Sequence, residues 1–367
     1  MEEVFFDLLR IAIGRSRNLS TIPTDEEWRC LYDTARKQSL LGVLFHGIQR
    51  SGMRLDKDLL LKWFLASEQI RQCNQKANKA AVELTQFFRD NGFRTCILKG
   101  QGNTLNYPES YIRTSGDIDV WVEGGCEKVL DWVRERVGNL KFCYHHIEFK
   151  KIGGVEVEVH YRPSFMNNLI HNRRMQRWFE RVADEQFRHE VELPDGVGKV
   201  CVPTNAFNRI YQMAHISNHF FHEGIGFRQM LDYYFVLRQG FTEEERVRDA
   251  RLLKHFGLYK MASAVMYVLQ ETLGMGTEFM IVSANEKLGR FLMDEILEAG
   301  NFGQHDSRTR YGRGRWVKNV QRLKRDMRLV RYFPSECLWE PVFRIWHWGW
   351  RKRFSLLVSK KKSSLYI

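Results

Sequence analysis

The sequence lacks any paired cysteine motif. Its seven Cys are scattered over 367 residues, and no two of them have the CxxC spacing of zinc and redox sites. Their number is odd and several lie in apolar runs, where a thiol packs as a small hydrophobe, so we expect free thiols in a reducing compartment. With 44% apolar and 13% aromatic residues, the composition excludes a disordered chain, a collagen and a disulfide scaffold.

Long apolar runs are also missing. No uncharged stretch approaches the roughly 18 residues that span a bilayer, and the longest candidate, residues 210–221, is interrupted by Gln, His and Asn. The first residues, Met1-Glu2-Glu3, are acidic and lack the basic and apolar regions of a secretory signal. We therefore expect a cytoplasmic protein, with at most peripheral contact at the inner face of a membrane.

Acidic residues are scarce in one segment only. Residues 301–367 hold 17 Lys and Arg against four Asp and Glu, which leaves 40 of each sign in residues 1–300. The formal net charge of +13 therefore lies entirely in this tail. A neutral body with a basic tail argues against a uniformly basic, nucleic-acid-coating protein.

The chain is longer than a single core normally accommodates, and its hydrophobic period changes along its length. A capping box at Thr24 and Glu27 and the stop at Asn91-Gly92 mark a helical first part, and a second capping box, Thr242 with Glu245, lies in a later helical part. Between these two helical parts, apolar residues recur at every second position, as they do in strands. The pattern predicts an N-terminal helical region (1–92), an α/β core (93–203), a C-terminal helical domain (204–300) and a basic, Trp-rich tail (301–367).

Two short runs within the α/β core carry acidic residues on strands. Asp117 and Asp119 alternate with Ile118, Val120 and Val122, so both carboxylates project from the same side of one strand. In the later run, Glu156 and Glu158 lie opposite three valines, which supplies a third carboxylate if the strands are neighbours. A divalent cation relieves the repulsion of such a set, and oxygen ligands alone favour Mg²⁺ or Mn²⁺ over zinc.

These residues resemble known sequence motifs. Gly100, the run Ser115-Gly116-Asp117-Ile118-Asp119 and Glu158 resemble the three-part signature of the DNA polymerase β-like nucleotidyltransferase superfamily. More narrowly, the chain resembles the bacterial family of uncharacterised nucleotidyltransferases over about residues 5–300. That resemblance is carried by Leu98-Lys99-Gly100, Tyr107-Pro108, Arg113, Glu158-Val159-His160-Tyr161-Arg162, His215, His219, Arg228 and Asp232.

The resemblance implies an α+β fold, in which a polymerase β-like core with a small mixed sheet is flanked by helical regions. It also implies transfer of a nucleotide from a nucleoside triphosphate, with two divalent cations held by the catalytic residues Asp117, Asp119 and Glu158. Nucleotide-binding residues would be Lys99, Gly100, Arg113, Ser115 and Gly116, and the substrate pocket would contain His160, His219, Arg228 and Asp232. The acceptor is open: a sugar, a lipid-linked intermediate, a metabolite, a protein or a tRNA. Gln101 departs from the superfamily's first motif, in which Gly or Ser normally follows the glycine.

Each signal has a structural alternative. An isolated Asp-x-Asp is common on solvated strands, Lys99 can be a surface lysine, Arg113 can pair with Asp117, and Arg228 with Asp232 can form a helix ion pair. His215, His219 and His222 have a helical spacing that suits zinc, although packing between helices or facing the cleft is favoured. The alternative function is a catalytically silent relative that binds nucleotide or a partner and is anchored by its basic tail to a membrane surface or to RNA.

The tail itself has three interpretations. A helical apolar face is predicted from Trp316 to Val330, ending at Pro334, and five of the ten Trp lie in the tail among Arg and Lys. This composition fits peripheral contact of residues 315–362 with an anionic membrane. It also fits single-stranded RNA, or aromatic residues that pack back onto the body while the cations stay solvated.

Overall fold

The computed structural model describes residues 2–138, 141–304, 306, 308 and 315–364, without the side chains of 315, 316, 318 and 355–364. Its centre is a four-stranded mixed sheet in the order β1-β2-β4-β3. The strands are β1 (Thr95–Ile97), β2 (Ile118–Val122), β3 (His146–Glu148) and β4 (Val157–His160). The central pair β2–β4 is parallel, whereas β1 and β3 pair antiparallel at the two edges.

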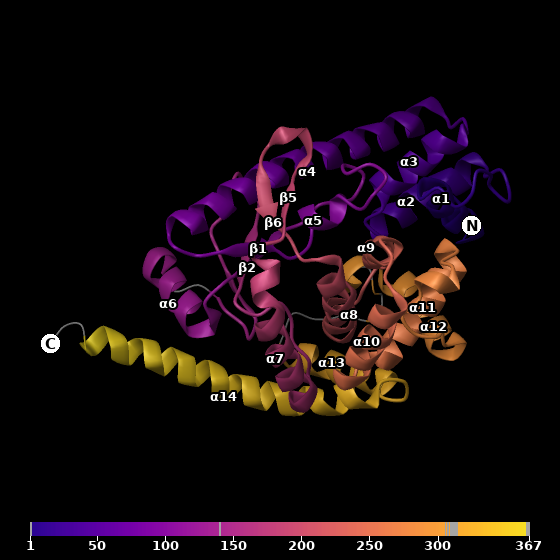
Figure 1. Ribbon diagram of the computed structural model, residues 1–367. Coiled ribbons are helices and arrows are strands. Elements are labelled where there is room, and N and C mark those ends of the chain that lie inside the picture. Colours follow the sequence, from indigo (N-terminus) through magenta and orange to yellow (C-terminus); the bar gives the residue numbers. More distant parts are fainter. Residues whose placement is uncertain (1, 139–140, 305, 307, 309–314, 365–367) are drawn as a thin grey trace.

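One face of the sheet is covered by apolar helices. The 34-residue helix α4 (Lys57–Asp90) crosses this face, and α6 (Gly125–Val137) packs beside it (Figure 1). Ile118, Val120, Val157 and Val159 are buried in the same apolar cluster as Phe88 of α4. A separate hairpin of β5 (Glu190–Glu192) and β6 (Lys199–Cys201), with a 3-10 turn at Pro194–Gly196, extends this cluster. Because the valine side of β2 and β4 is buried here, their carboxylates face the opposite side.

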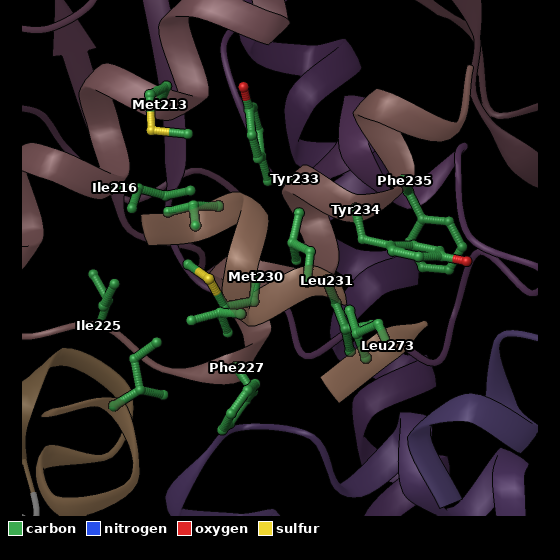
Figure 2. Close-up of a cluster of buried hydrophobic side chains, with 14 of the residues drawn as sticks. Met213, Ile216, Ile225, Phe227, Met230, Leu231, Tyr233, Tyr234, Phe235 and Leu273 are labelled. Atoms are coloured by element: carbon green, nitrogen blue, oxygen red, sulfur yellow. The ribbon is translucent and has the colours of Figure 1, made fainter. Parts of the chain in front are cut away.

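A second apolar core joins the two helical regions. Phe5 of the first helix stacks edge-on against Phe227, and both are buried with Tyr233 and Leu273. Figure 2 shows part of this core around Met213 and Leu273. Its helices are α1 (Glu2–Ala12), α2 (Asp25–Lys37), α3 (Leu41–Ser51), α8 (Asn205–His222), α9 (Phe227–Arg238), α10 (Glu243–His255), α11 (Tyr259–Leu273) and α12 (Glu286–Ala299).

Helix α7 (Leu169–Gln186) also belongs to this core, through Met175, Trp178 and Phe179. The remaining short elements are α5 (Gln101–Thr104) and the 3-10 turns Thr277–Phe279 and Asn301–Gly303. The predicted domain boundaries at residues 92, 203 and 300 stay a prediction. Residues that precede the sheet region in the chain and residues that follow it are buried together in the second core.

The tail forms two helices, α13 (Arg315–Leu329) and α14 (Pro334–Ser364). Pro334 begins α14, as proline does readily in a first helical turn, so the expectation that it ends the preceding helix was wrong. Figure 1 shows α14 running along the lower edge of the molecule, past α7 and α13. None of the helices in the described part of the chain combines the length and apolarity needed to cross a bilayer.

The α+β class is confirmed, as are both capping boxes and the helix that stops at Asn91-Gly92. The sequence interpretation missed α7, which lies in the region assigned a period of two. Its signal was local: Asn168 caps the helix by accepting hydrogen bonds from the amides of Ile170 and His171, and Met175 and Phe179 are buried one turn apart.

Candidate functional site

Three carboxylates meet where β2 and β4 lie side by side. The strands are paired in a register that places Asp119 opposite Glu158, and Asp117 lies just before β2. One oxygen from each of the three side chains lies within 4.8 Å of the others. The two strands are therefore neighbours, which was the condition for a third carboxylate, and the three oxygens are close enough to hold a divalent cation.

The two aspartates have very different surroundings. Repulsion from Asp119, followed by partial burial, raises the pKa of Asp117 to about 6, although its side chain is open to solvent. Asp119 is 4% exposed. Burial alone would raise the pKa of Asp119, but Lys99 and His160 outweigh burial and hold the pKa below its usual value. Asp119 therefore stays ionised while Asp117 gains and loses a proton near neutrality.

Lys99 and His160 supply this compensation through direct contacts. Lys99 Nζ lies 2.8 Å from Asp119 Oδ2, and His160 Nε2 lies 2.8 Å from Asp119 Oδ1 and 3.4 Å from Glu158 Oε2. Burial opposes the charged form of His160, yet its contacts with Asp119 and Glu158 raise its pKa to about 9. At neutral pH the half-buried Lys99 and the buried His160 thus balance most of the charge of three carboxylates.

On one side of the carboxylates lies a cavity of about 40 Å³, here called the cationic cavity. Arg113 is anchored in its wall, since Nε and Nη2 donate to the two oxygens of Asp232 at 2.7 and 2.8 Å. Tyr107 donates to the same carboxylate at 2.8 Å. Arg113 is thus paired with Asp232 rather than with Asp117, and this pairing replaces the expected ion pair between Arg228 and Asp232.

Arg228 makes fewer hydrogen bonds than Arg113 in the wall of this cavity. Its Nη1 donates to the Thr114 carbonyl at 3.1 Å, whereas Nε is buried without a hydrogen-bond partner among the described residues. Nε2 of the neighbouring Gln229 is also buried without a hydrogen-bond partner among these residues. Burial and then repulsion from Arg113 lower the pKa of Arg228. Two buried arginines, of which only Arg113 is hydrogen-bonded to an aspartate among the described residues, favour an anionic ligand in this cavity.

The turn after β1 closes the floor of the cationic cavity. Gly100 has φ 55°, a left-handed conformation that favours glycine, and it comes just before α5. Gln101 is buried and donates to Asn78 Oδ1 of α4 at 2.6 Å, so its side chain ties this turn to α4. Gly116 lines the cavity beside Arg228, and Ser115 lies half-buried before it.

On the other side of the carboxylates is a larger cavity of about 340 Å³, here called the histidine cavity. Six imidazoles line it: His145, His146, His160, His215, His219 and His222. Ser164 also lines it, and its hydroxyl is buried without a hydrogen-bond partner among the described residues. His219 contacts Glu223 at 3.0 Å and stacks edge-on against His215, so these helical histidines face the cavity rather than packing between helices.

The two cavities share part of their walls. Lys99, Asp117, Asp119, His215 and Phe302 line both. Phe302 comes from the 3-10 turn after α12, with φ 53°. The turn is pressed against the end of α8, where a Cβ at position 303 would collide with the backbone of residue 223. This close approach holds the Phe302 ring between the cavities.

His145 and His146 were not identified from the sequence. Ile152 pairs with Val155 next to the Gly153-Gly154 turn, and continuing this register would place Tyr161 opposite His146. Instead, His146 pairs with His160, because β3 has one residue more than β4 between the turn and the sheet. Such a bulge moves His146 to the carboxylate face.

The tail packs partly on the body. Arg325 of α13 donates to the carbonyl of Glu223 at 3.0 Å, next to the histidine cavity. In α14 the rings of Trp346 and Trp350 contact Tyr144, whereas the Trp348 side chain is 55% exposed. Of the apolar face expected from Trp316 to Val330, the side chains of Val320, Leu323 and Met327 are exposed, whereas Val330 is half-buried against the body. The side chains of Trp316 and of the 360–362 lysine run lie outside the described part of the chain.

Comparison with known proteins identifies the family. No curated protein matches the chain. A crystal structure of an antigenic nucleotidyltransferase-like protein from Paracoccidioides brasiliensis is similar, with 11% identity, a TM-score of 0.36 and coverage of 59% of this chain and 97% of that chain. The family model described as "Uncharacterised nucleotidyltransferase" matches residues 24–274, which is more than half of the chain. The chain therefore belongs to the uncharacterised nucleotidyltransferase family.

Proposed function

We propose that this protein transfers a nucleoside monophosphate from a nucleoside triphosphate to a hydroxyl or phosphate of an acceptor, in a reaction that depends on Mg²⁺ or Mn²⁺. The observation that carries the proposal is the convergence of Asp117, Asp119 and Glu158 between two cavities of different chemistry. When bound, divalent cations supply the positive charge that holds the triphosphate and activates the acceptor oxygen, one at each of two positions.

The cationic cavity is proposed to bind phosphate groups. Lys99, Arg113 and Arg228 contribute cations to its wall, and Arg228 keeps an unused donor there. A water molecule needs roughly 10–15 Å³, so about 40 Å³ holds only a few waters. The triphosphate therefore has to extend past the carboxylates toward the histidine cavity, and Phe302 lies on that path.

The histidine cavity is proposed to hold the acceptor group and the remainder of the nucleotide. Burial lowers the pKa of His215 and His222, the latter to about 4, so these imidazoles are neutral at neutral pH. Neutral imidazoles and the Ser164 hydroxyl supply hydrogen bonds without excess charge. A sugar, a lipid-linked intermediate, a metabolite, a protein or a tRNA end remain the candidate acceptors. Cytoplasmic location and bacterial origin also remain predictions.

Replacement of Asp117 by Asn is the decisive activity test. Asp117 is open to solvent and is repelled by Asp119, so the neutral isostere should remove a metal ligand without lowering thermal stability. We expect pyrophosphate release from the four triphosphates with Mg²⁺ or Mn²⁺ to be lost. Glu156→Gln is the matched control, since this exposed carboxylate pairs with Lys151 and lies outside the site. Equal turnover by Asp117→Asn and the natural protein would contradict the proposal, and no turnover by the natural protein would favour the catalytically silent alternative.

Metal affinity should depend on pH through Asp117. Because the folded-state pKa of Asp117 is raised to about 6, the carboxylate is ionised above that pH and protonated below it. We expect the affinity for Mg²⁺, measured by titration calorimetry, to be constant between about pH 7 and 8, where His160 keeps its charge, and to fall as the pH drops through 6. An affinity that stays unchanged down to pH 5 would show that Asp117 is not a ligand.

Arg228 should contribute directly to triphosphate binding. Arg228→Gln is expected to weaken binding of a non-hydrolysable triphosphate by about 1–3 kcal/mol, the scale of a charge-assisted hydrogen bond. Arg228→Lys should restore this only in part, since the planar fork is lost. Arg238→Gln, which removes an exposed arginine from the same helix, is the control. Equal affinities of Arg228→Gln and Arg238→Gln would return Arg228 to a structural role.

Contact of residues 315–362 with an anionic membrane also remains a proposal. Leu338, Val342 and Ile345 follow one another on one face of α14 and are 66%, 45% and 74% exposed. Trp348 is exposed nearby, with Lys352 Nζ 4.0 Å from its ring centroid. An apolar face bordered by cations suits the headgroup zone of anionic lipid.

We expect the protein to sediment with phosphatidylglycerol vesicles and to be released as salt rises, because the attraction is partly electrostatic. Ile345→Ser combined with Trp348→Ser should reduce sedimentation even at low salt. Leu65→Ser, at a position 57% exposed on α4, should not. Stronger binding of single-stranded RNA than of vesicles at equal salt would contradict the membrane proposal.

A further inference from the structure

Glu158 belongs to a second group of potential metal ligands. His146 of β3 lies beside His160 of β4, two residues from Glu158, so all three side chains face the same way. His146, Glu158 and His160 each place one ligand atom within 4.8 Å of the other two. This group contains two imidazoles and one carboxylate, whereas the group with Asp117 and Asp119 contains oxygen ligands only.

The separations between these atoms fit one coordination sphere. His146 Nδ1 lies 3.2 Å from Glu158 Oε2, and His160 Nε2 lies 3.4 Å from the same oxygen. Ligands at about 2.0–2.1 Å from a tetrahedral ion are roughly 3.3–3.4 Å apart. The side chains can therefore accept an ion with little movement of the strands, which are already held in register.

The surroundings of His160 orient its ligand nitrogen. His160 Nδ1 lies 3.3 Å from the Arg162 carbonyl, which accepts a hydrogen bond from this nitrogen and directs Nε2 toward the carboxylates. A backbone carbonyl on the far nitrogen is the usual support of a metal-binding histidine. His145 Nε2 contacts His146 Nδ1 at 3.1 Å, and an ion on Nδ1 replaces that contact.

We propose that Glu158 is shared by two neighbouring cation positions, and that the position formed with His146 and His160 binds a divalent transition-metal ion in preference to Mg²⁺. Imidazole nitrogen is a good ligand for Fe²⁺, Co²⁺ and Zn²⁺ and a poor one for Mg²⁺, which takes oxygen and water. Three protein ligands leave coordination positions for water or substrate, and all three residues line the histidine cavity.

Binding of Co²⁺ tests this site without any substrate. The full-length protein, freed of metal by chelation, is titrated with Co²⁺ in excess Mg²⁺, and the visible d–d absorption is recorded. We expect one Co²⁺ to bind despite the Mg²⁺. Replacing a residue that only supports a metal ligand typically lowers metal affinity by roughly 10–100-fold. His146→Gln removes a ligand itself, so we expect a larger loss of Co²⁺ affinity. His215→Gln, another imidazole of the same cavity, should leave the Co²⁺ spectrum unchanged.

Two further variants keep the result interpretable. Glu158→Gln should also abolish the Co²⁺ band, so the test does not depend on correct folding of one histidine variant. Asp117→Asn should keep the band, because Asp117 belongs only to the all-oxygen group. If the Co²⁺ band is present but the protein has no nucleotidyl transfer activity, the metal site is upheld and the proposed function fails. If the protein transfers nucleotides but shows no Co²⁺ band, the proposed function is upheld and the metal site fails.

Three outcomes would overturn the proposal. The first is displacement of Co²⁺ by Mg²⁺, and the second is a Co²⁺ affinity that His146→Gln leaves unchanged. The third is a near-ultraviolet thiolate band that Cys143→Ser removes. Cys143 Sγ lies 3.2 Å from His145 Nδ1, so this band would show that the ion binds Cys143, His145 and His146 instead.

Discussion

The parallel pairing of β2 and β4 is the constraint on which the site depends. It places Asp119 opposite Glu158, and the valines on the other side of both strands are buried against α4 and α6. A shift of one residue in either strand would turn the carboxylates into the apolar core. Correct register therefore determines both the stability of the sheet and the composition of the site. Charged residues on this face are tolerated because Lys99 and His160 lie among the carboxylates.

Local alternation was enough to place Asp117 and Asp119 on one face, because side chains two apart on a strand share a face whatever the rest of the chain does. On the later strand it left both Glu156 and Glu158, and the resemblance to known motifs selected Glu158. The same reasoning could not place His146, since its face depends on one extra residue in the connection to β4. Nor could it find the pair of Arg113 with Asp232, which are 119 residues apart. That contact arises from packing of α9 against the loop before β2, and periodicity contains no information about it.

The tail shows the same limit. Its basic and aromatic composition was visible in the sequence, but the same residues could bind lipid, bind RNA or pack on the body. In the structure different residues of α14 do different things: Trp350 contacts Tyr144, whereas Ile345 and Trp348 are exposed. A helix that is apolar on two sides cannot be assigned one role from composition. Which side is buried depends on distant residues such as Tyr144 of the sheet region.

Charge balance links the site to the proposed substrates. In the metal-free protein between about pH 6 and 9, three carboxylates face the cations Lys99 and His160, which leaves a single net negative charge. Divalent cations alone would make this buried cluster strongly positive, whereas a triphosphate brings roughly four negative charges with them. Two divalent ions and one triphosphate together restore the original balance. Metal and nucleotide should therefore bind cooperatively. The same charge balance applies to an ion held by His146 and His160. His160 must release its proton to become a ligand, so part of the positive charge that the ion adds leaves with that proton.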